Sequence, residues 1–275
     1  FFMDPDLNAP TVYGGGMSRY WHTTTDTMDV ISPNAMRLIA AISAAYTYFL
    51  ANAGKTEALY LAEETAAIHH QKLAEYAAAM VKTMRLGDGP FAEHPLYRGI
   101  RRDVALGRML DVIELMSETA VNAVKSVLRL VDGDDKTDVR TAIKPLTASL
   151  ARFAKESAAR LRDVAGIEPS ELDYRGRQFA DRHIPVKKFI GPPSFDSVDS
   201  RRRRNELIRE YGAGRWDTSQ QIALFWTDGK RTLHDVIRRT RAEYYGRFDP
   251  DEFVDQFRGL SEAGLIEFKR LKDDE

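Results

Sequence analysis

The chain has 275 residues, of which 43% are hydrophobic and 29% charged, with a formal net charge of −1. This composition excludes a disordered tail, and the near-neutral charge gives no global attraction to nucleic acid or to anionic membranes. The absence of cysteine excludes disulfides and cysteine-ligated zinc, and no apolar run is long enough to span a bilayer.

The first predicted element is a short strand. Thr11 and Val12 lie between Pro10 and the glycines at 14–16, a pattern that predicts a strand arriving at a tight turn. In open α/β sheets, the loops beyond the carboxyl ends of strands carry the functional site. The residues after this turn are therefore well placed to carry one.

The segment that follows, residues 19–33, reads RYWHTTTDTMDVISP and is the stretch whose order suggests a specific chemistry. His22 and Asp26 are metal-ligand types, but two ligands at this spacing need a helix, which the β-branched threonines disfavour. The whole string closely resembles the last zinc-ligand segment of the M28 family of metallo-aminopeptidases. The similarity extends back through residues 2–12, without the Ser-Asp-His segment that usually precedes them, and forward into the next helix.

The resemblance implies that residues 1–54 form the C-terminal end of an α/β peptidase domain. His22 would be one imidazole ligand of a two-zinc centre, with the other ligands and a general-base Glu upstream of Phe1. Asp26 would fix the loop or the His22 ring, whereas Tyr20 and Trp21 would line the pocket for the first side chain of a peptide substrate or serve only in packing. The family also implies a secreted or periplasmic location.

The chain opens on Phe1 and Phe2 without an initiator Met or a signal-peptide pattern. We therefore interpret it as the C-terminal portion of a longer enzyme, inactive alone, with the upstream peptidase domain as its first partner.

Helices dominate the prediction from Ser32 onward. Ser32 and Pro33 form a helix start, and an apolar stripe from Met36 to Leu50 continues until Gly54 and predicts a core-facing helix. Residues 55–166 then predict a bundle of three long helices over 56–86, 97–130 and 139–164, with a turn at 132–135 rather than a calcium loop. By analogy with M28 relatives, this bundle would serve homodimerisation or cover the peptidase domain.

The remaining histidines predict no metal site. His69 and His70 are adjacent on a predicted helix and point about 100° apart, so they are interpreted as a partly exposed pair. His94 and His183 each precede a proline or an Ile-Pro pair, without a second plausible ligand nearby.

Residues 167–215 are predicted to be a connector, because glycine and proline interrupt any long element. Its run of four arginines, 201–204, lies among acidic residues and is interpreted as a solvated helix start.

Residues 216–275 predict a small α+β domain that resembles a winged helix. The expected elements are helices 219–226, 233–245 and 250–263, followed by a strand at 265–269. The third helix is acidic, which argues against insertion into a DNA groove. The arginines of the second helix favour docking within the chain or between subunits.

The fold class is therefore mainly α: the edge of an α/β peptidase domain, a helical bundle and a winged-helix-like domain. The function implied by the resemblance is zinc-dependent aminopeptidase activity. The alternative is a non-enzymatic adaptor that binds a protein partner or nucleic acid.

Overall fold

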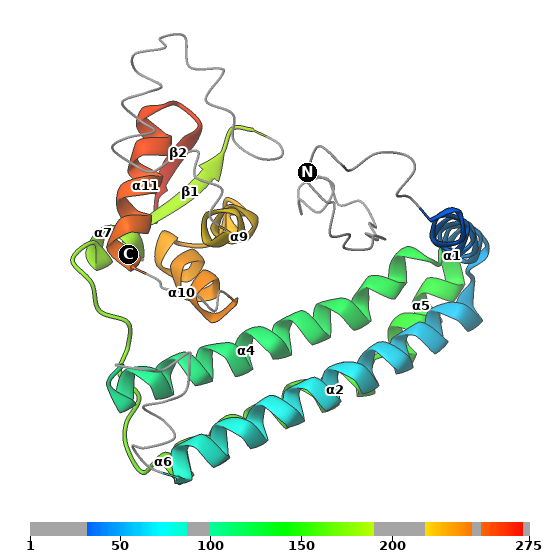
Figure 1. The fold of residues 1–275 in the computed structure, drawn as a ribbon, viewed down its shortest axis with the longest axis horizontal. Coiled ribbons are helices and arrows are strands. Elements are labelled where there is room, and N and C mark those ends of the chain that lie inside the picture. Colours follow the sequence, from blue (N-terminus) through cyan, green and yellow to red (C-terminus); the bar gives the residue numbers. More distant parts are fainter. Residues whose placement is uncertain (1–31, 87–99, 190–217, 244–248, 272–275) are drawn as a thin grey trace. The chain divides into compact units, whose positions relative to one another are not determined.

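The structure is a computed structural model that describes residues 32–86, 100–189, 218–243 and 249–271. The described chain is mainly α, as the sequence predicts, with a single antiparallel pair of strands (Figure 1). Among these residues, no helix combines the length and apolarity needed to cross a membrane. The predicted strand at 11–13 lies outside the described residues.

The described residues divide into two compact units. One contains residues 32–68 and 120–150, and the other contains residues 69–119 and 151–271. Helices α2 (Lys55–Arg85), α4 (Arg102–Ser126) and α6 (Lys144–Ala165) contribute residues to both.

The first unit begins with α1 (Pro33–Asn52), which starts as predicted. The Ser32 side chain accepts a hydrogen bond from the Ala35 amide, and Pro33 occupies the first turn. None of the residues of α1 is buried. The core of this unit comes instead from alanines of α2, from Ala120 and Val124 of α4 and from Leu150 of α6, together with the 3-10 helix η2 (Val127–Arg129) and α5 (Gly133–Ala142).

Two details of this unit differ from the sequence prediction. Residues 132–135, predicted to be a turn, form the start of α5, with Asp132 as its N-cap residue. The predicted helix 139–164 is divided at Ile143, where α5 ends and α6 begins. Pro145 explains the division, because proline lacks the amide proton of an interior helical residue but fits the first turn of α6.

In the second unit, α2, α4 and α6 pack around a core of Leu73, Met84, Leu106, Met109 and Leu161, each at most 1% exposed. Burying such side chains stabilises the unit by about 1.5–3 kcal/mol each.

The same unit contains the C-terminal elements α7 (Arg177–Arg182), β1 (His183–Lys187), α9 (Thr218–Trp226), α10 (Leu233–Glu243), α11 (Pro250–Glu262) and β2 (Ile266–Arg270). The last three helices match their predicted ranges closely. Glycines with positive φ, Gly229 and Gly264, form the turns after α9 and after α11.

The strand β1 lies within the range predicted to be a connector. It pairs with β2 in antiparallel register, with His183 opposite Arg270 and Lys187 opposite Ile266 (Figure 1). Apolar side chains of α7, α9, α10, α11 and β2 form one core around Phe257 and Ile237. Residues 177–187 are thus a structural part of the C-terminal segment rather than a tether to it.

Candidate functional site

The residues that sequence reasoning assigns to the zinc site, His22 and Asp26, and the pocket residues Tyr20 and Trp21 lie outside the described residues. Only the helix that follows them, α1, is described. Within the described part of the chain, no group of three or more His, Asp or Glu side chains is arranged to hold a metal ion.

The pair His69 and His70 is half-buried, in agreement with its interpretation as a partly exposed pair. The His70 ring meets the edge of Phe153, with ring centroids 5.3 Å apart. Burial, assisted by nearby Lys72, lowers the pKa of His69 and favours the neutral ring at pH 7. The His70 ring thus lies against α6, and adjacent helical positions direct the two side chains about 100° apart.

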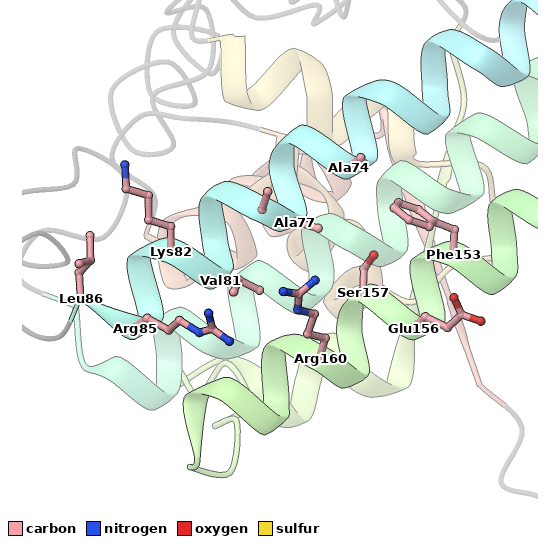
Figure 2. Close-up of a pocket in the computed structure, with 11 residues that line it drawn as sticks. Ala74, Ala77, Val81, Lys82, Arg85, Leu86, Phe153, Glu156, Ser157 and Arg160 are labelled. Atoms are coloured by element: carbon pink, nitrogen blue, oxygen red, sulfur yellow. The ribbon is translucent and has the colours of Figure 1, made fainter.

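A groove of about 700 Å³ runs between α2 and α6 in the second unit. One wall is formed by residues of α2 at helical spacing, and the other by residues of α6 (Figure 2). The lining is Ala74, Ala77, Ala78, Val81, Lys82, Arg85, Leu86, Phe153, Glu156, Ser157 and Arg160. A volume of this size lies within the range of small-molecule sites in proteins.

The groove has a largely apolar end, where Glu156 lies beside Phe153, and a basic end (Figure 2). Figure 2 shows Ala74 and Phe153 at one end, and Arg85 and Arg160 extending toward each other near the other. Lys82 adds a third cation, whereas Glu156 is the only acid in the lining. An excess of cations over an apolar floor favours anionic ligands that also carry apolar surface.

A second polar feature of the same unit joins α4 to α10. Arg238 Nη2 lies 2.9 Å from Glu114 Oε2, and Arg239 Nη1 lies 2.6 Å from Glu118 Oε2. The Arg239 contact is ionic rather than a well-aligned hydrogen bond, because Nη1 has no partner of suitable geometry among the described residues. Arg238 and Arg239 of α10 thus pair within the chain, which is one of the two roles, docking within the chain or between subunits, that the sequence predicts for the arginines of this helix.

Trp226 lies among these charges. The guanidinium carbon of Arg231 is 5.2 Å and that of Arg239 5.0 Å from the centre of the indole ring. Cations at this distance from an indole face are attracted to it. Glu118 is in ion-pair contact with both arginines, so one acidic residue of α4 anchors both cations that flank the ring.

Asp111 lies on the same side of α4, 3.6 Å from Arg238 Nε. Burial raises the pKa of its carboxyl group from 3.8 to about 6, despite the opposing effect of Arg238 and Arg241. Glu114 and Asp235 add to the rise through like-charge repulsion. The desolvation of the carboxylate outweighs the attraction of its cations.

Two aromatic contacts fix the C-terminal core. Tyr174 Oη and His234 Nδ1 share a hydrogen bond of 3.0 Å, and burial raises the pKa of Tyr174 and lowers that of His234. His183 at the start of β1 stacks on Phe179, with ring centroids 3.9 Å apart. His234 and His183 therefore contribute to the packing of the C-terminal core.

The groove was not predicted from the sequence, although the sequence contains the regular spacing of the α2 residues that line it. Ala74, Ala77, Ala78, Val81 and Arg85 recur at helical spacing and mark one small, basic-ended face of α2. Arg160 stands 75 residues downstream of Arg85, and only the packing of α6 beside α2 brings the two together.

Comparisons with known proteins identify no relative: no protein-family model, curated protein or solved structure matches this chain.

Proposed function

We propose that this chain is the C-terminal portion of a zinc-dependent aminopeptidase that removes N-terminal residues from peptides. The observation that carries the proposal is the string at residues 19–33, with His22 followed by three threonines and Asp26. Its order matches the last zinc-ligand segment of M28 peptidases, whose other ligands would lie in the upstream domain.

In this proposal His22 supplies one imidazole nitrogen to the metal site. Asp26 would hold the His22 ring or the backbone amides of the threonine run, which fixes the direction of the ligand nitrogen. Tyr20 and Trp21 would contact the first side chain of the substrate. Two bound zinc ions would supply polarisation of the scissile carbonyl and activation of a water molecule.

The position and exposure of α1 support the proposal. The helix starts at Pro33, the last residue of the segment, as the family resemblance leads us to expect. The stripe residues Met36, Ile39 and Ile42 are 55%, 37% and 56% exposed. An apolar stripe of this extent is typical of a helix that packs against a further domain, and the upstream peptidase domain is the cover that we propose.

The other parts would support this enzyme. The helices α2, α4 and α6 would form a bundle that covers the peptidase domain or joins two subunits. The order of α9, α10, α11 and β2, with β1 as the second strand, is similar to a winged helix, for which we propose a docking role. The family resemblance also suggests a secreted or periplasmic enzyme.

The experiment is to measure zinc content and aminoacyl-anilide hydrolysis for the 275-residue chain and for the complete product of its gene. We expect the chain alone to bind zinc weakly and to lack activity, because one imidazole supplies one of about four zinc ligands. The complete protein should contain tightly bound zinc and cleave substrates with a free amino terminus. A complete protein without zinc and without activity would contradict the proposal.

The second candidate is a non-enzymatic adaptor, and the α2/α6 groove favours it because an open, charged groove is typical of a binding surface. This candidate predicts that the complete protein lacks zinc but retains ligand binding at the groove.

A further inference from the structure

We propose that the α2/α6 groove binds an amphiphilic anion. Arg85 and Arg160 would hold a phosphate or carboxylate head, and the apolar chain would lie along the alanine-lined floor. The inference is independent of zinc and of peptide hydrolysis.

The two arginines provide the head site. They come from different helices and extend toward each other across the groove (Figure 2). Neither makes an ion pair with another residue that the structure describes. Two facing guanidinium groups repel each other until an anion neutralises them, and each presents paired donors that match a phosphate or carboxylate.

Ser157 adds a hydroxyl donor to the groove. Its residue is only 8% exposed, it lines the groove, and the structure gives it no hydrogen bond to any described residue. It lies three positions before Arg160 on α6, and residues at this spacing are neighbours on one helix face. A bound anionic head would accept a hydrogen bond from this hydroxyl.

The floor fits a single apolar chain. Ala74, Ala77, Ala78 and Val81 place only methyl groups along α2, with the Phe153 ring on the facing wall. The stretch from Ala74 to Arg85 rises by roughly 16 Å, which suits a medium-length alkyl chain. The small side chains leave the space that larger residues would fill.

The distribution of charge decides between occupants. The cations gather at one end, so an acidic helix with carboxylates along its length would meet them only there. Self-association along the groove in parallel would place cations against cations. In the antiparallel arrangement each basic end would face the apolar end of the other copy, whose lining has Glu156 as its only acid. A ligand with one anionic end and one apolar end therefore matches this distribution of charge better than an acidic helix or a second copy of the chain.

The test is isothermal titration of the 275-residue chain with dodecyl phosphate below its micelle concentration. Inorganic phosphate tests the head alone, and dodecyl maltoside tests the chain with a neutral head. The double variant R85Q/R160Q removes the head site, whereas R152Q removes an exposed arginine of α6 outside the groove. The variant A78W fills the floor from an exposed position, so the core stays intact.

We expect dodecyl phosphate to bind with one site per chain and more tightly than either control compound. The affinity should fall by at least about tenfold in R85Q/R160Q and in A78W and stay unchanged in R152Q. Equal binding to R85Q/R160Q, or equal binding of dodecyl maltoside, would overturn the proposal. Binding confined to phosphatidic acid vesicles would assign the groove to a membrane surface, and binding confined to an acidic helical peptide to a protein partner; either result would also overturn it.

Discussion

At the scale of single residues, the buried carboxyl group of Asp111 creates a pH dependence of stability. Its pKa in the folded protein is about 6, against an ordinary value of 3.8, so the folded state binds the proton more tightly than the unfolded state. The contribution of this group therefore increases the free energy of unfolding as the pH falls from about 6 to about 4. The charged carboxylate destabilises the fold at neutral pH.

The variant Asp111→Asn should remove this effect. We expect it to raise the free energy of unfolding by about 1–2 kcal/mol at neutral pH and by much less at about pH 4. Urea denaturation at both pH values measures the difference. Asp163→Asn, at an exposed position of α6, is the control and should change neither value. A gain of equal size at both pH values would show that Asp111 does not titrate in this range.

Glu118 and Glu114 offer a second comparison between neighbouring residues. Glu118 is in ion-pair contact with Arg231 and Arg239, and the Arg239 side chain is only 11% exposed. Glu114 pairs with Arg238 but is itself 59% exposed. We expect Glu118→Gln to cost about 1–3 kcal/mol, because a buried cation loses a partner, and Glu114→Gln to cost under about 1 kcal/mol. Thermal unfolding compares the two, and equal losses would contradict this account.

At the scale of elements, Gly107 allows the chain after α6 to approach α4. A Cβ atom at this position would lie 2.5 Å from the carbonyl oxygen of Ser170. The Ser170 amide donates to the Asp103 carbonyl at 3.1 Å, which holds the oxygen in place. The close approach therefore requires glycine.

The variant Gly107→Ala separates two effects of opposite sign. Helix propensity alone would stabilise α4 by up to about 1 kcal/mol, whereas displacement of the Ser170 backbone should destabilise the fold by about 1–3 kcal/mol. We expect the second effect to dominate in chemical denaturation. A more stable Gly107→Ala protein would show that the segment at Ser170 moves away from α4 at little cost.

Element boundaries that depend on local signals could be predicted from the sequence. Two helix starts in the structure are marked by a cap residue followed by proline, Ser32 with Pro33 and Asp249 with Pro250. The strand β1 could not be found in this way, because it contains Pro185 and pairs with residues about 80 positions later. Proline is tolerated in an edge strand, but it weakens the sequence signal for one. Pairing that depends on tertiary contacts is not encoded in a local pattern.

The candidate sites also differ in whether a local stretch of sequence reveals them. Residues 19–33 suggest a metal ligand because the residues that resemble a zinc-ligand segment are consecutive in the chain. The α2/α6 groove and the contacts of Glu118 depend on helices distant in sequence, so residue types alone could not reveal them.

At the scale of the whole molecule, α1 offers a test of the proposal that an upstream domain covers this helix. Ile42 is 56% exposed on a helix without buried residues. We expect Ile42→Asp to change the stability of the 275-residue chain by less than about 0.5 kcal/mol. In the complete protein, where the peptidase domain would cover this side chain, the same change should cost about 2–5 kcal/mol. Thermal unfolding of both proteins, with and without the substitution, provides the measurement. Equal effects would mean that nothing covers α1.

The most direct test of the central claim is His22→Ala in the complete protein, assayed for zinc by elemental analysis and for hydrolysis of an aminoacyl-anilide. We expect the variant to lose zinc and nearly all turnover, because one ligand of the centre is gone. Asp26→Ala should lower the rate of hydrolysis by about 10–100-fold, because the His22 ring would no longer be held in the direction of the metal. His70→Ala, on a half-buried helix position against Phe153, should keep both zinc and activity. Unchanged zinc and an unchanged rate in His22→Ala would contradict the aminopeptidase proposal and favour the adaptor.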